Sequence, residues 1–365
     1  MSALMADYVL THPDQINVEW LARVLRRSGA LTDGDVAAFD LETRERNLST
    51  IVRLRVRYSA GARGDRPEHL FLKMVSMDQD EESLGPWEVE YYRRDYVGLA
   101  RVPLVRCYDA AYSAEQRCYH LVLDDLSASH VEAGEEAPTL AYGLALAEAL
   151  AGLHAPYWGS KRIAAAGHVL PATAEIERFV AISRPGGVPI LGAHAAQLRP
   201  HWPEAIHDIF ARHPRAMLAR TGDDHGFTLI HGDTNGQNIL VPRDGDRPLY
   251  LIDPQPFDWR LTVWLGVYDL ANAIVWRWEV ELRRRLELPI LRRYHEQLIA
   301  YGIDNYSWAQ LLDDYRLSAA MGVYVATEWC RAGLDEEWTH VWLPMLQKTL
   351  TACDDLNCRE LWVAH

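Results

Sequence analysis

One stretch of this 365-residue chain limits its fold more than any other. A short apolar run at 227–230 precedes a polar loop, and two further apolar runs, at 239–242 and 248–252, flank Arg243-Asp-Gly-Asp246. Asp-Gly between two apolar runs is typical of a β-hairpin, because this dipeptide adopts the turn that two antiparallel strands need. The stretch therefore predicts a buried strand, a loop and a hairpin, in that order.

An acidic or amide residue lies beside each of these predicted elements. Asp233 follows the first strand, Asn238 stands just before the hairpin and Asp253 just after it. In an antiparallel pair, the residue that enters the first strand lies beside the residue that leaves the second, so we expect Asn238 and Asp253 to meet. Amide and carboxylate oxygens are ligands that Mg²⁺ accepts. Phosphoryl transfer from a metal-bound nucleotide needs this pair and a carboxylate that orients the accepting hydroxyl, which we assign to Asp233.

Each of these residues also has a simpler interpretation. His231-Gly-Asp233 by itself is most often a turn, and an Asn before a strand is most often a cap or a bend. Asp269, in Tyr268-Asp-Leu-Ala271, could be the N-cap of a helix. We favour the catalytic interpretation because a strand precedes the loop, a hairpin follows it and an acidic residue ends the hairpin.

These residues together resemble the aminoglycoside phosphotransferase and choline-kinase-like superfamily, which is related to protein kinases. The resemblance rests on His231-Gly-Asp233, Asn238, Ile252-Asp253 and Tyr268-Asp-Leu-Ala271. It implies that Asp233 is the catalytic base and that Asn238 and Asp253 bind Mg²⁺. It further implies that Asp269 supports the catalytic loop, which His231 is expected to orient through hydrogen bonds. The sequence departs from the family pattern after Asp253, where Pro-Gln-Pro replaces the usual aromatic residue.

The resemblance implies a bilobal, protein-kinase-like α+β fold. We expect a nucleotide-binding lobe at 1–122, with an antiparallel β-sheet and one key helix, and a hinge at 123–128. A larger, mainly helical lobe is expected at 129–365, with the catalytic loop and the acceptor site. The hydrophobic pattern fits this division, because strands are predicted at 48–58 and 69–75 and helical periodicity dominates the second part of the chain.

Prolines, glycines and periodicity predict where helices begin and end. Helices are expected at 17–27 and at 140–154. Between 173 and 220, two or three more are expected, with breaks at Arg184-Pro-Gly-Gly-Val-Pro189 and at His213-Pro214, because proline disrupts the hydrogen-bond ladder of a helix. The remaining helices are predicted at about 270–287, 289–301, 307–332 and 337–352.

Lys73 is placed inside the apolar run His69-Leu-Phe-Leu-Lys-Met-Val75. Strand alternation puts it on the same face as Phe71 and Val75, where an ammonium group needs a partner. The α- and β-phosphates of ATP, together with a carboxylate from the next helix, would supply one. The alternative is a strand-edge lysine that extends to solvent.

The helix that follows is predicted at 86–96 and contains two glutamates. In the family pattern the glutamate that pairs with the lysine stands four residues before a large apolar or aromatic side chain. Glu88, ahead of Tyr92, fits this spacing, and Glu90 is the alternative.

Two further segments are assigned to the nucleotide by resemblance. Backbone amides from Asn47 to Ser49 are expected near phosphate, although the turn predicted at 43–49 contains no glycine. The apolar strand at 119–126 is expected to end in the hinge, which would meet the adenine through Leu123, Asp124 and Asp125. The alternative is an ordinary edge strand. Contacts of this kind leave no side-chain signature, so ATP and GTP both stay open as the donor.

Charge and cysteine content argue against other classes of protein. The net charge of −14 weighs against a nucleic-acid partner, because a phosphate backbone calls for a basic surface. No apolar run reaches the ~18 residues typical of a membrane-spanning helix. Five scattered cysteines without CxxC spacing favour a reducing cytoplasm over disulfide bonds or structural zinc.

The acceptor site has the weakest signal. Nine of the thirteen tryptophans follow residue 258, and flat rings suit sugar faces and cations. We select Trp259, Glu328 and Trp329 as acceptor residues. An acidic protein can also concentrate a cationic small molecule.

The sequence thus predicts an enzyme that transfers the γ-phosphoryl group of ATP to a hydroxyl of a small molecule, such as an aminoglycoside, an amino sugar or a similar natural product. One alternative is a kinase-like nucleotide-binding module with a regulatory role and no catalysis. A metal hydrolase built on His231 and Asp233 is disfavoured, because further His ligands at suitable spacing are missing. The oligomeric state is left open.

Overall fold

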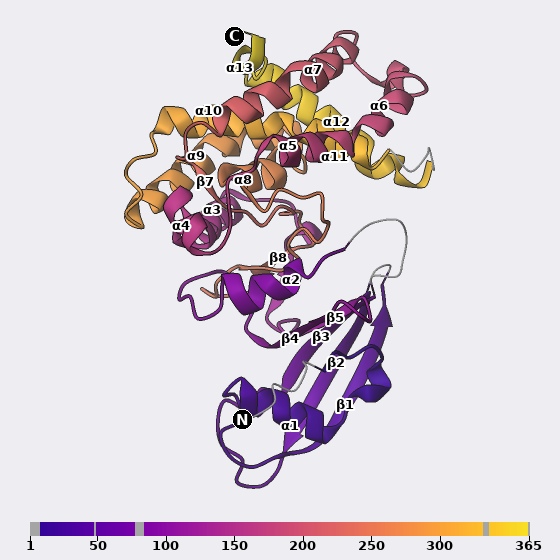
Figure 1. The fold of residues 1–365 in the computed structure, drawn as a ribbon, viewed down its shortest axis with the longest axis vertical. Coiled ribbons are helices and arrows are strands. Elements are labelled where there is room, and N and C mark those ends of the chain that lie inside the picture. Colours follow the sequence, from indigo (N-terminus) through magenta and orange to yellow (C-terminus); the bar gives the residue numbers. More distant parts are fainter. Residues whose placement is uncertain (1–7, 47–48, 77–83, 331–335, 364–365) are drawn as a thin grey trace.

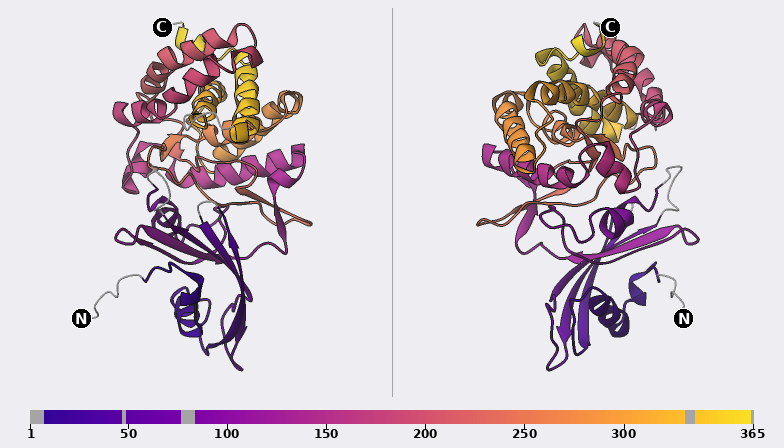
Figure 2. Two further views of the ribbon diagram at one scale, coloured as in Figure 1. Left: turned by 90° about the vertical axis from the view of Figure 1, so that its right-hand side faces the viewer. Right: turned by 60° about the vertical axis from the view of Figure 1, so that its left-hand side comes forward.

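The computed structural model of the chain describes residues 8–46, 49–76, 84–330 and 336–363, and it has two parts (Figure 1). The N-terminal part is built on a β-sheet, and the C-terminal part is mainly helical, as Figure 2 shows from two other directions. This arrangement confirms the predicted bilobal α+β fold. Within the described residues, no helix combines the length and the apolar character that crossing a membrane requires.

The N-terminal sheet is antiparallel and has five strands in the order β1-β2-β3-β5-β4. Helix α1 (Val18–Arg27) packs on it, and its buried residues share a core with those of β2 and β3. Asn17 caps this helix by accepting a hydrogen bond from the backbone N–H of Trp20 at 2.9 Å. The strands are β1 (Val36–Glu45), β2 (Ser49–Tyr58), β3 (His69–Ser76), β4 (Cys107–Ser113) and β5 (Cys118–Asp124).

One prediction for this sheet was wrong, and one alternative is excluded. Residues 43–45 continue strand β1, so the turn predicted from residue 43 starts later than expected. The end of this strand could not be predicted from its polar side chains, because β1 is mostly exposed and lacks the apolar alternation of a half-buried strand. Strand β5 is not an edge strand, since it lies between β3 and β4.

A short helix lies between strands β3 and β4, where one was predicted at 86–96. Helix α2 (Trp87–Glu90) continues directly into the π-helical turn η2 (Tyr91–Asp95). Figure 1 shows α2 between the sheet and the helical part. Val89, Tyr91 and Tyr92 are buried in the large core that extends through the helical part.

The C-terminal part contains short strands beside its helices. Strands β6 (His130–Glu132), β8 (Ile239–Pro242) and β9 (Tyr250–Leu251) form one small sheet, and β7 (Phe227–Leu229) pairs with β10 (Val263–Leu265). The helices are α3 (Leu140–His154), α4 (Ser160–Ala165), α5 (Thr173–Ala181), α6 (Arg184–Leu191), α7 (Trp202–Arg220), α8 (Val267–Ile274), α9 (Val280–Ala300), α10 (Trp308–Ala320), α11 (Gly322–Glu328), α12 (Glu336–Asp355) and α13 (Glu360–Val363). Single 3₁₀ turns lie at Pro13–Gln15, Ala133–Glu135, Ala155–Tyr157 and Ala195–Gln197.

Several helix boundaries differ from the prediction. The segment at 184–189 is not a break, because it begins helix α6, and Pro185 stands in the first turn, where its missing N–H is not needed. Helix α7 continues through Pro214, and α9 continues through Pro289. The break expected near 288 instead lies between α8 and α9, and the helix expected at 307–332 is divided at Met321. Tertiary packing of apolar faces outweighs the cost of one lost hydrogen bond in these helices.

The glycines of α6 allow it to approach α11 closely. A Cβ atom added to Gly186 would lie 1.7 Å from the backbone oxygen of Thr327 and 3.0 Å from Cβ of Cys330. A Cβ on the neighbouring Gly187 would meet its nearest atom, in the ring of Phe210, at 4.0 Å. Only the first of these two glycines is therefore needed for the contact.

We predict that Gly186→Ala lowers the free energy of unfolding by roughly 1–3 kcal/mol, because the new methyl group forces α6 away from α11. Gly187→Ala is the matched control, and it should be neutral or stabilising by up to about 1 kcal/mol, since alanine favours the helix. Urea denaturation midpoints of the two variants and the wild type measure the difference. Equal midpoints for the two variants would show that the close contact does not exist.

Candidate active site

The loop that carries Asp233 is held by the buried carboxylate of Asp269. Asp269 lies in the first turn of α8, and its side chain has no exposed surface. Its Oδ2 accepts hydrogen bonds from the backbone N–H of His231 at 2.7 Å and from Nε2 of His154 at 3.0 Å, and its Oδ1 accepts one from the N–H of Gly232 at 2.9 Å. Asp269 is thus not the N-cap of α8, since the N-cap position belongs to Gly266.

Two hydrogen bonds of His231 identify its protonation state. Its Nε2 donates to the backbone oxygen of Ile252 at 2.9 Å, and its Nδ1 accepts from the N–H of Asp233 at 3.3 Å. Burial lowers the pKa of His231, although Asp269 and Asp233 act in the opposite direction. A neutral imidazole with its proton on Nε2 fits both contacts. His231 therefore joins the loop to the strand before Asp253 and is not available as a base.

Two amides fix the carboxylate of Asp233. Asn238 Nδ2 donates to Oδ2 of Asp233 at 3.0 Å, and Asn235 Nδ2 donates to Oδ1 at 3.0 Å. Asn238 Nδ2 also lies 2.9 Å from the backbone oxygen of Asp233 and 3.2 Å from that of Asp253. Since the nitrogen of Asn238 faces the protein, its amide oxygen is the atom left for a ligand.

The hairpin places Asn238 near Asp253. Ile239 pairs with Leu251, and the N–H of Ile252 donates to the backbone oxygen of Asn238 at 3.0 Å. Asp253 then adopts a left-handed backbone conformation, with φ of 54°. Non-glycine residues rarely adopt this conformation, and it often accompanies a functional role.

Lys73 connects this hairpin to the N-terminal sheet. Its Nζ lies 2.8 and 3.0 Å from the two carboxylate oxygens of Glu88 and 3.0 Å from Oδ1 of Asp253. Tyr119, on β5, donates a hydrogen bond of 2.7 Å to Glu88. The side chain of Lys73 is 13% exposed, so it does not extend to solvent. Glu90, the alternative partner, pairs instead with Arg94 at 3.0 Å.

The ammonium of Lys73 stabilises the charged forms of the carboxylates beside it, and they stabilise the ammonium. Burial acts to lower the pKa of Lys73, but Asp253 and Glu88 raise it well above the ordinary value, so the ammonium persists. Burial acts to raise the pKa of Asp253, and Lys73 reverses this effect, so the net shift is downward. One ammonium group stands between two carboxylates, which leaves an excess of negative charge where a cation would be favoured.

The donor set near Asp253 fits a hard divalent cation. Asn238 offers an amide oxygen, and the carboxylate of Asp253 is 45% exposed and thus accessible. Oxygen ligands and negative charge are what Mg²⁺ requires, and such sites usually use one or two carboxylates together with substrate phosphates. Asn238 and Asp253 are therefore the residues that would hold the metal.

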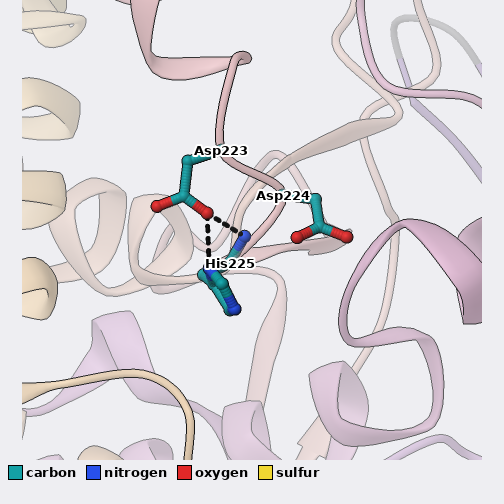
Figure 3. Close-up of side chains that lie close together, drawn as sticks. All are labelled: Asp223, Asp224 and His225. Carbon is teal, nitrogen blue, oxygen red and sulfur yellow. Dashed lines mark hydrogen bonds and ion pairs between the residues drawn. The ribbon is translucent and has the colours of Figure 1, made fainter.

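A second cluster of metal-ligating residue types lies elsewhere and has a structural explanation. Asp223, Asp224 and His225 come close together just before β7, as Figure 3 shows. Asp223 accepts hydrogen bonds from both the backbone N–H and Nδ1 of His225. Asp224 instead accepts from the hydroxyl and the backbone N–H of Ser160, at the start of α4. These contacts shape a turn and a helix start, so we assign no metal to this cluster.

The residues expected to contact the nucleotide base are largely engaged with the protein. Asp124 accepts a hydrogen bond of 2.5 Å from the hydroxyl of Tyr108, and Asp125 accepts one of 2.9 Å from the N–H of Ser127. The backbone N–H groups of Asp124 and Asp125 donate to Arg106 and His69. Leu123 is buried in β5, Ser49 begins β2, and Asn47 lies outside the described residues.

A small cavity adjoins Asp233 on the side of the helical lobe. Trp259, predicted as an acceptor residue, lines it with Phe179, Gln255, Asn272, Trp276 and Val325. Glu328 and Trp329 are at the end of α11 and do not line this cavity. Burial raises the pKa of Glu328 to about 7, and Trp329 contacts the ring of Trp338.

The sequence analysis missed Tyr119, Asn272 and Arg277 near the site. Tyr119 pairs with Val75 across the sheet, so a register for β3 and β5 would have placed it near Lys73. Arg277 approaches Asp233, with Nη2 3.9 Å from Oδ1. Nothing in the local sequence around Arg277 points to this contact, because it depends on how α8 packs against the loop.

Several solved structures share this architecture. An ethanolamine kinase from Plasmodium vivax has a TM-score of 0.56 at 12% sequence identity, over 88% of this chain and 83% of that one. A choline kinase from Cryptosporidium parvum has a TM-score of 0.57 at 8% identity, over 94% of this chain and 97% of that one. The GDP complex of aminoglycoside 2'-phosphotransferase IIIa has a TM-score of 0.52 at 14% identity, over 92% of this chain and 99% of that one.

At the level of sequence, no protein-family model and no curated protein matches this chain. The likeness therefore concerns the fold, which extends over most of each chain. This fold consists of an antiparallel sheet, a short second helix and a large helical lobe. These parts occur in the order that the sequence predicted. The chain shares its bilobal fold with these ethanolamine, choline and aminoglycoside kinases.

Proposed function

We propose that this protein is a small-molecule kinase that transfers the γ-phosphoryl group of ATP, or of GTP, to a hydroxyl of its acceptor. The acceptor belongs to the range of aminoglycosides, amino sugars and similar natural products. The proposal includes the division into a nucleotide lobe at 1–122, a hinge at 123–128 and an acceptor lobe at 129–365. The convergence of Lys73, Asp253, Asn238 and Asp233 carries it.

The acceptor hydroxyl donates a hydrogen bond to Asp233 in this mechanism. Asn235 and Asn238 each hold one oxygen of that carboxylate, so its orientation is fixed before the substrate arrives. The transition state of phosphoryl transfer is loose in most analyses, so alignment of the hydroxyl contributes more than removal of its proton.

Lys73 binds the α- and β-phosphates. Its ammonium has three N–H donors, which now serve the two oxygens of Glu88 and one of Asp253. Mg²⁺, when bound by Asn238 and Asp253, would neutralise charge on the phosphates. Asp253 would hold the metal together with Asn238, and Lys73 would offer its N–H donors to the phosphates.

A catalytically silent nucleotide-binding module is the second candidate. A module of this kind can lose the carboxylate that orients the hydroxyl. Here that carboxylate is present, is held by two amides and adjoins a cavity. We therefore favour catalysis, and Mg²⁺-dependent ADP release with hydroxylated compounds discriminates between the two.

We predict that Asp233→Asn lowers turnover by about 10²- to 10⁴-fold, because the neutral amide aligns the acceptor hydroxyl less strongly than the carboxylate and cannot accept its proton. The affinity for ATP should change little, since Asp233 does not contact the ammonium of Lys73. Formation of phosphorylated product measures turnover, and calorimetry measures ATP binding. Full activity in this variant would exclude the proposed role of Asp233.

Glu88→Gln should lower kcat/KM for ATP by roughly 10- to 100-fold, because Lys73 loses a buried charged hydrogen-bond partner. The matched control is Glu90→Gln, which removes only the partly exposed pair with Arg94 and should change kcat/KM by less than about twofold. Equal effects of the two substitutions would contradict the assignment of Glu88.

Asp253→Asn should raise the Mg²⁺ concentration needed for half-maximal activity by roughly tenfold or more, because the site loses a negative ligand. Asp258→Asn, five residues later in the same loop, is the control and should leave this requirement unchanged. Titrations of ADP release against Mg²⁺ test both variants. An unaltered requirement in the first variant would place the metal elsewhere.

A further inference from the structure

Arg277 lies beside Asp233 but makes no hydrogen bond to it. It follows α8, and its side chain is 27% exposed. Its Nη2 is 3.9 Å from Oδ1 of Asp233, which is too long for a hydrogen bond. Within the described parts of the chain, its side chain donates no hydrogen bond, and its Nε is buried without a partner. The donors of its two terminal nitrogens are thus left for a ligand.

The surroundings of Arg277 confirm this shortage of partners. Burial lowers its pKa, and the nearby Asp233 and Tyr268 offset this effect only in part. A charged side chain in such a place is normally paired. The position is fixed, because Nζ of Lys348, on α12, donates to the backbone oxygen of Arg277 at 2.8 Å.

Arg277 and the metal-binding residues approach different oxygens of Asp233. Asn238, which would hold the metal, donates to Oδ2. Arg277 approaches Oδ1, and its neighbour Trp276 lines the cavity beside Asp233. The nucleotide would lie with the metal on the Oδ2 side, so Arg277 lies on the side that is left for the acceptor.

The cavity has more unpartnered donors than acceptors. Arg260 lines it, with its guanidinium carbon 4.9 Å from the centre of the Trp87 ring, and burial lowers its pKa to about 10. Among the described residues, Nε of Arg260 and Nε1 of Trp259 are buried without a partner, and so is one acceptor, Oδ1 of Asn272. The wall of the cavity is therefore richer in unpartnered donors than in unpartnered acceptors, which favours a ligand with acceptor oxygens.

We propose that the acceptor carries an oxyanionic group, a carboxylate or a phosphate ester, which binds to Arg277 while the reacting hydroxyl meets Asp233. Arg260, which lines the cavity beside Asp233, adds a second positive charge near this group. This inference rests on the proposed function and narrows the acceptor to those natural products that carry such a group. It disfavours polycationic aminoglycosides and simple amines as acceptors, because two arginines would repel them.

The γ-phosphoryl group is another oxyanion that Arg277 could reach. Binding of Arg277 to the acceptor and binding of Arg277 to the γ-phosphoryl group predict different effects of acceptor charge. If Arg277 binds the acceptor, its loss affects anionic acceptors alone. If Arg277 binds the transferring group, its loss affects every acceptor equally.

The binding test uses the full chain, with ¹⁵N-labelled arginine, in the presence of Mg²⁺ and ADP. Matched pairs of probes, glycerate with glyceramide and lactate with lactamide, differ in charge and keep the same hydroxyls. We expect saturable shifts of the Nε–H resonance of Arg277 with the acids and none with the amides. No saturable shift with the acids, or an equal shift with the amides, would overturn the inference.

Arg277→Gln and Arg277→Lys both assign this resonance, so the test does not depend on one variant folding. In Arg277→Gln, binding followed through Arg260 should weaken by about 10- to 100-fold for glycerate. Arg285→Gln, an exposed arginine on α9, is the matched control and should leave the affinity unchanged. Unchanged affinity in Arg277→Gln would contradict the assignment.

The catalytic test compares glucuronate, glucose and glucosamine as acceptors of phosphate. Preference for glucuronate that disappears in Arg277→Gln supports the inference, whereas preference for glucosamine, or an equal loss with all three, overturns it. Failure of the proposed function is distinguishable. It would appear as oxyanion binding at Arg277 with no Asp233-dependent transfer to any hydroxylated compound.

Discussion

The site depends on one buried ammonium group that carboxylates from two other segments share. Lys73 on β3 contacts Glu88 on α2, 15 residues away, and Asp253 after β9, 180 residues away. A buried lysine is costly unless it is paired, so these contacts hold the sheet, the short helix and the hairpin in one arrangement. The pairing also leaves more negative than positive charge, which favours a cation and a nucleotide together.

A second buried charge, Asp269, organises the loop that carries Asp233 in a different way. Asp269 is satisfied mainly by N–H groups, from the backbone of His231 and Gly232 and from the ring of His154. A carboxylate that accepts several hydrogen bonds is stable in the interior and fixes the backbone that donates them. The loop therefore presents Asp233 on a rigid support, as a positioning mechanism requires.

The two sides of Asp233 have opposite electrostatic character. On the side of Lys73, the carboxylates of Asp253 and Glu88 outnumber the one ammonium group, and a metal would restore the balance. On the side of the cavity, Arg277 and Arg260 each keep a buried Nε–H without a partner among the described residues. The net charge of −14 describes the whole chain and does not describe this cavity, because local burial determines which charges a ligand experiences.

Features that depend on neighbours along the chain could be predicted from the amino-acid order. It predicted the strand, loop and hairpin around Asp233 and the strand that contains Lys73, because alternation and turn residues are local signals. Helix boundaries were less predictable. Proline and glycine at 184–189 suggested a break, yet contact with α11 retains a helix there.

Contacts between groups that are distant in the chain became clear from the packing of whole elements. Glu88 and not Glu90 reaches Lys73, because the turn of α2 directs one of them inward. Trp259 lines the cavity while Trp329 lies outside it, and Arg277 approaches Asp233 without any local signal. Hydrogen bonding along a chain follows from sequence order. Contact between residues far apart follows from how whole helices pack, which no short segment encodes.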